Sequence, residues 1–237
     1  MQNKLTLIIR SLLFYIGHYA LIVAFSLIGL LLRPLPLTTR LKFMRIGVKL
    51  CLLWLHLSCN IKHKVHNLEC ITPDQASIVL SRHESTWETL AFHTIFPLQV
   101  NVVKKELKNI PFFGFILVTL NAILIDRTHK LTAIKQIKKE AAQAIKRGFW
   151  IVIFPGGTRI RPGELTQVQS GGAILAKQEN VPVYLVTHNA GKTWSKGTFI
   201  KYPGTIDVYI KRLENSEQKS IETINSEAQA WFQSQYQ

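Results

Sequence analysis

The chain has 237 residues, of which 47% are hydrophobic and 18% charged, and its mean hydropathy is +0.14. This length suits one full-sized α/β domain with an appendage rather than two independent cores. The net charge is +15 at pH 7, and nine Lys and Arg residues precede the first acidic residue, Glu69. Because these cations are mixed with long aliphatic side chains, the composition argues against a nucleic-acid-binding protein and favours an anionic membrane surface. The spacing of Cys51, Cys59 and Cys70 fits neither a metal site nor a disulfide framework.

The first predicted element is an apolar helix. Residues 12–32 contain no Lys, Arg, Asp or Glu and lie between Arg10 and Arg33. At about 1.5 Å per helical residue, this stretch reaches the ~30 Å of a hydrocarbon core. The alternative is a signal peptide, but no small-x-small cleavage site follows the stretch. We therefore predict a retained membrane helix, either spanning or re-entrant.

The second predicted helix, residues 41–57, carries a single basic stripe. Its members recur at steps of three, four and seven residues: Lys42, Arg45, Lys49 and His56. Such a stripe on an otherwise apolar helix predicts a position at the lipid interface, whereas the alternative is a second core helix. Residues 1–60 are thus expected to form a two-helix membrane-anchoring motif, and residues 61–237 the main domain.

From residue 77 onward, short β-rich runs alternate with helical stretches. The predicted strands are 77–80, 100–104, 123–125, 150–154, 183–186 and 205–210, and the predicted helices are 131–147 and 216–237. This alternation predicts an α/β fold with a mixed, largely parallel sheet flanked by helices. In such sheets, functional side chains gather on the loops that follow the carboxyl ends of the strands.

The first candidate site is SRHESTWE, residues 81–88, directly after a predicted strand. A separation of five residues would turn His83 and Glu88 about 140° apart on one continuous helix. The two side chains can meet only if His83 lies in the loop and Glu88 in the first turn of the next helix. The carboxylate would then hold one ring nitrogen and leave the other free to take a proton. A capping box, with Ser85 as N-cap, explains Glu88 equally well, and both roles can coexist.

The second candidate site is IFPGGTRIRPGE, residues 153–164, which also follows a predicted strand. Gly156, Gly157 and Thr158 offer close backbone approach, and Arg159 offers a planar fork suited to a phosphate. An ordinary tight turn is the alternative interpretation. The stretch lacks the lysine of a P-loop, and no GxGxxG occurs, so nucleotide binding is not favoured.

Five ordered blocks resemble those of the glycerolipid acyltransferases, specifically the 1-acylglycerol-3-phosphate acyltransferases. SRHESTWE resembles the family's His-x4-Asp box, here His-x4-Glu, and FPGGTR resembles its FPEGTR block. The other matching stretches are KKELKNIPFFG at 104–114, IDR at 125–127 and VPVYLVTHNAG at 181–191. Two departures stand out, because Glu88 occupies the place of the usual aspartate and Gly156 the place of a glutamate.

The resemblance implies transfer of a fatty acyl group from a thioester of acyl carrier protein or coenzyme A to the sn-2 hydroxyl of 1-acylglycerol-3-phosphate, giving phosphatidic acid. His83 would be the general base and Glu88 its orienting carboxylate, with no metal, cofactor or covalent acyl-enzyme. The residues that match the family's substrate-binding positions are Lys104, Lys105, Gly157, Thr158 and Arg159. Residues 61–237 would then be the acyltransferase domain.

Three further groups have two interpretations each. His188 lines the site or is a local hydrogen-bond partner. Asp126 and Arg127 contact substrate or form a structural ion pair. Aromatic side chains of the second block form an acyl tunnel or pack in the core: Phe112, Phe113 and Phe115.

The expected partners are membrane lipids, a lysophospholipid acceptor and the acyl donor, with the domain on the cytoplasmic face of a bacterial inner membrane. Two alternative functions remain open. One is O-acyl transfer to another lysolipid, such as lyso-ornithine lipid, because phosphate recognition depends mainly on Arg159 and the two lysines. The other is a catalytically silent lipid-binding protein, which the change at Gly156 allows.

Overall fold

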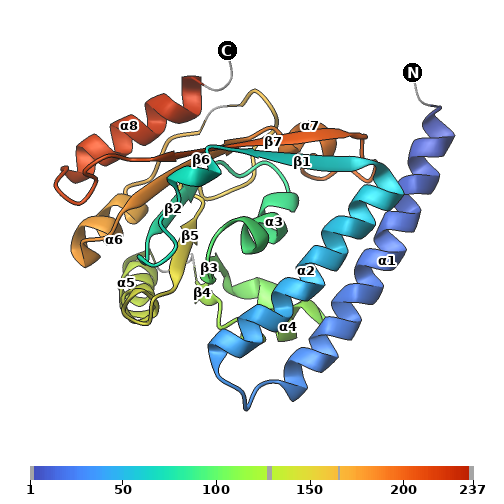
Figure 1. The fold of residues 1–237 in the computed structure, drawn as a ribbon, viewed down its shortest axis with the longest axis horizontal. Coiled ribbons are helices and arrows are strands. Elements are labelled where there is room, and N and C mark those ends of the chain that lie inside the picture. Colours follow the sequence, from blue (N-terminus) through green and yellow to red (C-terminus); the bar gives the residue numbers. More distant parts are fainter. Residues whose placement is uncertain (1–2, 127–129, 165, 235–237) are drawn as a thin grey trace.

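The computed structural model describes residues 3–126, 130–164 and 166–234, except for the side chains of residues 130–134. Its centre is a seven-stranded sheet of order β1-β7-β6-β2-β5-β3-β4, in which only β6 and β7 pair antiparallel. The strands are β1 Ile61–His66, β2 Ile78–Ser81, β3 Gln99–Lys104, β4 Ile123–Ile125, β5 Trp150–Ile153, β6 Val183–His188 and β7 Gly204–Arg212. The predicted mixed, largely parallel sheet flanked by helices is confirmed (Figure 1).

Eight α-helices are described around this sheet. They are α1 Lys4–Leu31, α2 Leu37–Cys59, α3 Trp87–Ile95, α4 Phe113–Thr119, α5 Lys130–Lys146, α6 Gly171–Glu179, α7 Ala190–Thr193 and α8 Ile221–Ser234. Two short 3-10 helices, η1 Leu68–Cys70 and η2 Lys105–Asn109, follow β1 and β3. Both predicted N-terminal helices are present, and they lie side by side as a hairpin (Figure 1).

Close packing at Gly17 joins the two hairpin helices. A Cβ atom at Gly17 would lie within van der Waals overlap of the Trp54 indole, so only glycine allows this approach. The indole Nε1 in turn donates hydrogen bonds to the carbonyls of Leu13 (3.1 Å) and Phe14 (3.2 Å). The second hairpin helix, α2, ends at the left-handed C-cap Asn60, whose N–H donates to the carbonyl of His56.

Strand side chains alternate between two separate hydrophobic layers. Ile78 and Leu80 of β2 belong to the layer that includes residues of α5, α6 and α8, whereas Val79 belongs to the layer that includes residues of α3 and of the α1–α2 hairpin. Both faces of the central strands are therefore buried, which explains why the sequence shows them as short apolar runs. The carboxyl ends of β2, β5, β3 and β4 share one edge, since these neighbours are parallel.

One strand and three helices, α4, α6 and α7, were not predicted from the sequence, and several helix boundaries differ from the predictions. β1 was not predicted, because this edge strand, IKHKVH, pairs only with β7 and has few buried side chains. The predicted helix over 216–237 begins only at Ile221, since residues 214–218 form turns. Its last three residues lie outside the described part of the chain.

The basic stripe of α2 only partly faces outward. Lys42 and Lys49 are exposed, but the Arg45 guanidinium donates to the carbonyl of Phe96 at 2.7 Å. The prediction that the whole stripe lies at a lipid interface is therefore wrong for Arg45, which fixes α2 to the end of α3. The opposite side of α2 is buried in both hydrophobic layers, through residues such as Leu41 and Leu55.

Candidate active site

His83 and Glu88 form a direct pair at the carboxyl end of β2. His83 lies in the loop after the strand, and Glu88 is the second residue of α3. His83 Nδ1 is 2.8 Å from Glu88 Oε1, and the two side chains are 18% and 0% exposed. The ring of His83 also stacks on Phe154, with 4.1 Å between ring centroids. The predicted arrangement of loop histidine and first-turn carboxylate is thus present.

Glu88 also makes the capping contacts that the sequence left as an alternative. The same Oε1 accepts the backbone N–H groups of Glu84 (2.9 Å) and Ser85 (2.8 Å). Burial raises the pKa of Glu88, but His188, the hydrogen bond from His83 and the N–H of Ser85 together hold that pKa below its ordinary value. The carboxylate is therefore ionised beside the histidine, and pairing and capping coexist.

A buried ion pair, Arg82–Glu84, flanks His83 and was missed in the sequence. Arg82 Nε lies 3.2 Å from Glu84 Oε1, and both side chains are almost fully buried. The guanidinium also donates to the carbonyls of Glu164 and Phe232, and Glu84 Oε2 accepts the N–H of Gly191. Burial raises the pKa of Glu84, and the nearby positive charge of Arg82 opposes that rise. The opposite charges of Arg82 and Glu84 on either side of His83 were the sequence feature that could have indicated this ion pair.

His188 proves to be both a local hydrogen-bond partner and a neighbour of the pair. Its Nδ1 accepts the N–H of Ala190 at 3.3 Å, so Nε2 carries the proton and donates to the carbonyl of Arg82 at 3.1 Å. The same Nε2 lies 4.0 Å from Glu88 Oε2. Among the described residues this carboxylate oxygen has no hydrogen-bond partner.

The predicted phosphate turn follows β5, next to β2. Gly157 adopts φ +72°, which favours glycine, and its N–H donates to the carbonyl of Phe154 at 3.0 Å. Arg159 Nη1 donates to Thr86 Oγ1 at 2.9 Å, which brings the arginine to the start of α3. Thr158 is exposed beside it. The structure thus gathers Thr158 and Arg159 at the edge that holds His83.

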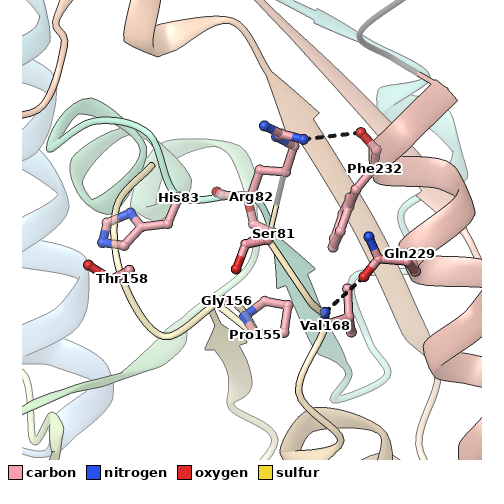
Figure 2. Close-up of a pocket in the computed structure, with 10 residues that line it drawn as sticks. Ser81, Arg82, His83, Pro155, Gly156, Thr158, Val168, Gln229 and Phe232 are labelled. Carbon is pink, nitrogen blue, oxygen red and sulfur yellow. Dashed lines mark hydrogen bonds between the residues drawn. The ribbon is translucent and has the colours of Figure 1, made fainter. Parts of the chain in front are cut away.

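Gly156 lines a small cavity behind His83 (Figure 2). Figure 2 shows His83 and Thr158 on one side of this cavity and Phe232 and Gln229 of α8 on the other. Gly156 does not have a positive φ. A Cβ atom there would nevertheless lie 2.5 Å from Thr166 Cγ2, so the threonine side chain occupies the space that a residue larger than glycine needs.

Lys104 and Lys105 lie at the end of β3 and the start of η2, at the same sheet edge. Their side chains are each 51% exposed. Lys104 Nζ is 3.3 Å from Glu106, and Lys105 Nζ is 3.6 Å from Asp126. Asp126 therefore pairs with a lysine of the second block, while its predicted partner Arg127 lies outside the described residues.

The aromatic side chains after η2 do not pack in the core. Phe112 and Phe115 are 39% and 44% exposed and form an edge-to-face pair. The Phe112 carbonyl accepts a hydrogen bond from Ser26 Oγ of α1 at 2.8 Å. Core packing, one of the two interpretations given above, is therefore wrong for these two residues, which form an apolar surface beside α1.

The fold and the site together define an α/β protein with a histidine–carboxylate pair at the carboxyl edge of its sheet and an apolar helical hairpin at its N-terminus. The family model described as "Acyltransferase" matches residues 62–225. A 1-acyl-sn-glycerol-3-phosphate acyltransferase from Pseudomonas aeruginosa is 36% identical, over 94% of this chain and 88% of its own. The chain belongs to the acyltransferase family.

A more distant relative and a solved structure are also similar to this chain. A 1-acyl-sn-glycerol-3-phosphate acyltransferase from Limnanthes douglasii is 28% identical, over 63% of this chain and 54% of its own. The crystal structure of the 1-acyl-sn-glycerophosphate acyltransferase of Thermotoga maritima is similar to this chain. The superposition includes 99% of this chain and 96% of the Thermotoga chain. It has a TM-score of 0.82 at 22% identity, which supports the fold.

Proposed function

We propose that this protein transfers a fatty acyl group from an acyl thioester to the sn-2 hydroxyl of 1-acylglycerol-3-phosphate, giving phosphatidic acid. The observation that carries the proposal is the 2.8 Å His83–Glu88 pair at the carboxyl edge of the sheet. The relatives named for this activity, one of them similar over nearly the whole chain, support the same reaction. The thioester is that of acyl carrier protein or coenzyme A.

The proposed step uses His83 as general base. Because Glu88 holds a proton on Nδ1, Nε2 of His83 accepts the proton of the acceptor hydroxyl as its oxygen attacks the thioester carbonyl. The C–S bond then breaks, and the leaving thiolate takes up that proton from the imidazolium. The ionised Glu88 stabilises the imidazolium while it exists. The step needs no metal, cofactor or covalent acyl-enzyme.

The proposed acceptor phosphate is bound by the turn after β5. Arg159 offers two parallel N–H donors for phosphate oxygens, and its contact with Thr86 brings it next to the His83 loop. Thr158 and the backbone of Gly157 lie in the same turn. Lys104 and Lys105, both half-exposed, add positive charge at the same sheet edge.

The proposed location is the cytoplasmic face of a bacterial inner membrane. α1 is long and apolar enough to cross a membrane, with a mean hydropathy of 1.9 in its most apolar window. The exposed Lys42 and Lys49 of the adjoining α2 suit the anionic headgroups of that face.

Thiol release from an acyl thioester tests the proposed function. Purified protein in detergent is expected to release thiol when lysophosphatidate is added, and more slowly with lyso-ornithine lipid, which lacks the phosphate. Faster release with lyso-ornithine lipid would contradict the assigned acceptor. Absence of release with every lysolipid and both donor types would favour a silent lipid-binding protein.

A further inference from the structure

The buried ion pair beside His83 takes no part in the proposed proton transfer. Arg82 and Glu84 lie on either side of the histidine, and their side chains are 1% and 0% exposed. Replacement of a buried ion pair by apolar side chains of similar size often leaves a protein as stable as before or more stable, because both charges have been removed from water. Stability alone therefore does not account for this pair.

The Arg82 guanidinium connects the His83 loop to two distant segments. Its Nη2 donates to the carbonyl of Glu164 at 2.7 Å, at the end of the turn that contains Arg159. Its Nη1 donates to the carbonyl of Phe232 at 3.2 Å, in the last turn of α8 (Figure 2). Carbonyls in that turn lack partners within the helix, and a cation is favourable there. Nε, Nη1 and Nη2 thus each face a different acceptor, which the planar fork of arginine allows and a lysine ammonium does not.

The Glu84 carboxylate connects the same loop to the segment after β6. Its Oε2 accepts the backbone N–H of Gly191, the second residue of α7, at 3.2 Å. The approach is close, because a Cβ atom at Gly191 would lie 2.9 Å from this oxygen and 2.9 Å from Cγ of Pro162. Glu84 therefore uses one oxygen for Arg82 and the other for α7. A glutamine has a single accepting oxygen and cannot replace both contacts.

The backbone of the same two residues holds the groups that orient His83. The N–H of Glu84 donates to Glu88 Oε1 at 2.9 Å, and this oxygen is 2.8 Å from His83 Nδ1. The carbonyl of Arg82 accepts the hydrogen bond from His188 Nε2 at 3.1 Å. A shift of residue 82 or 84 would therefore move the partners of Glu88 and, through that carboxylate, the imidazole. A displacement of about 1 Å can lower a reaction rate about 100-fold.

We propose that Arg82 and Glu84 are positioning residues for the general base. Arg82 holds the turn after β5 and the end of α8 against the His83 loop, and Glu84 holds α7 against it. The two side chains neutralise each other behind the loop and fix the distance between His83 and Glu88. This inference rests on the proposed function, because that reaction gives His83 its role as base.

Arg82→Lys, with Arg212→Lys as its matched control, tests the role of the guanidinium. Lysine keeps the charge opposite Glu84 but cannot reach all the acceptors of Arg82. The kcat for acyl transfer is expected to fall about 10- to 100-fold, while the KM values for lysophosphatidate and the thioester stay within about threefold. Arg212 is exposed and pairs with Tyr184 at the start of β6, at the opposite edge of the sheet, so its variant is expected to keep the wild-type kcat. A change confined to the KM values would overturn the proposal.

Removal of the whole ion pair separates positioning from stability. Arg82→Met and Glu84→Met each leave one buried charge unpaired, so each is expected to lower the Tm. The double variant Arg82→Met/Glu84→Met leaves neither charge, so its Tm is expected to recover toward the wild-type value. Its kcat is nevertheless expected to stay about tenfold or more below wild type, because the contacts to α7, α8 and the turn are lost. A double variant that regains the wild-type kcat would show that the pair serves stability alone.

The Nδ1–H proton of His83 gives a readout that needs no turnover. In protein with isotope-labelled histidine, NMR identifies this signal by its absence from His83→Ala. The signal is expected far downfield in wild type and in Arg212→Lys, because the proton lies between Nδ1 and the ionised Glu88. In Arg82→Lys and in the double variant it is expected to move upfield or to exchange away. An unmoved signal in both would overturn the positioning role and leave the proposed function standing. The expected movement in a protein that releases thiol with no lysolipid would support the positioning role and contradict the proposed function.

Discussion

At the scale of single residues, the candidate site combines capping and pairing in one carboxylate oxygen. Glu88 Oε1 accepts two backbone N–H groups and faces His83 Nδ1. The N–H contacts hold the carboxylate rigidly where the loop meets α3, and the same atom fixes the imidazole. A side chain that serves the fold can in this way also prepare a general base.

Substitution of Glu88 by glutamine separates the two roles. The amide oxygen of Glu88→Gln can still accept the backbone N–H groups, so the fold is expected to remain. Turnover is expected to fall by about 10²–10⁴-fold, because an amide cannot stabilise the imidazolium. Steady-state kinetics and circular dichroism measure the two effects, and Glu88→Asp serves as the charged control. Turnover of Glu88→Gln within about twofold of wild type would leave Glu88 as a cap alone.

His188 is expected to affect activity through the pKa of Glu88. Replacing it by leucine removes a group that lowers the pKa of Glu88, while burial continues to raise that pKa. The acid limb of the kcat/KM profile is therefore expected to move to higher pH in His188→Leu, and the maximum rate to fall. His66→Gln, at the Asp207 contact on β1, is the histidine control and is expected to keep the wild-type profile. A uniform loss of rate with an unmoved profile would indicate a purely structural role.

The stability cost of placing a side chain at Gly156 is expected to depend on Thr166. Its backbone accepts a side chain, but a Cβ atom would lie 2.5 Å from Thr166 Cγ2. Gly156→Ala is therefore expected to lower the free energy of unfolding by about 1–3 kcal/mol. In a Thr166→Ala background the same substitution is expected to cost much less, which a double-mutant cycle of thermal or denaturant unfolding measures. Additive effects would show that Thr166 is not the obstacle.

At the scale of elements, the α2–α3 contact contains a histidine that the fold keeps neutral. His93 of α3 accepts a hydrogen bond from Asn101 Nδ2 at 3.1 Å through Nε2, which therefore carries no proton. Burial, with the positive charge of Arg45, lowers the pKa of His93 to about 4. The same Arg45 binds the carbonyl of Phe96 and fastens the two helices together.

The lowered pKa of His93 predicts that the free energy of unfolding depends on pH. Below pH 6.5 the unfolded chain binds a proton at His93 that the folded chain does not bind until about pH 4. The free energy of unfolding is therefore expected to fall as pH decreases from 6.5 to 4, by about 3 kcal/mol from this group. His93→Gln removes the titration, so its Tm is expected to fall less over the same interval. Parallel Tm curves for the two proteins would contradict the prediction.

At the scale of the whole molecule, the apolar surface extends beyond the N-terminal hairpin. Phe112 and Phe115 are exposed beside α1, whose Leu31 is 80% exposed and Leu27 50% exposed. Contiguous exposed apolar side chains of this kind mark a surface that binds a membrane or a partner. α1 is long and apolar enough to cross a membrane. We therefore expect the 112–115 segment to enter the same bilayer as α1.

Loss of these two rings is expected to weaken membrane attachment. Each buried phenylalanine contributes about 1.5–3 kcal/mol of transfer free energy. The double variant Phe112→Ser/Phe115→Ser is therefore expected to be released in part by alkaline carbonate, whereas wild-type protein stays in the membrane pellet. Leu68→Ser, an exposed leucine of η1, is the control and is expected to stay in the pellet. Equal resistance of the double variant would mean that α1 alone holds the protein.

The sequence by itself determined the local structure and the composition of the site. The 21-residue apolar run, the short buried strands and the five-residue spacing of His83 and Glu88 each have a local physical cause, either hydrophobic periodicity or loop geometry. They predicted a mixed, largely parallel sheet and placed the histidine after a strand. The ordered motifs predicted the family.

Only the tertiary structure decided which distant residues meet. His188 faces Glu88 across 100 positions of sequence, and Lys201 Nζ reaches Tyr15 across 186. The backbone N–H of Lys201 also donates to Ser11 of α1. These contacts depend on how helices and strands pack, and no periodicity in a single segment encodes them. A cavity lined by Tyr15 of α1, Arg159 and Phe199 is likewise a product of the packed molecule, because its walls come from segments that are far apart in the chain.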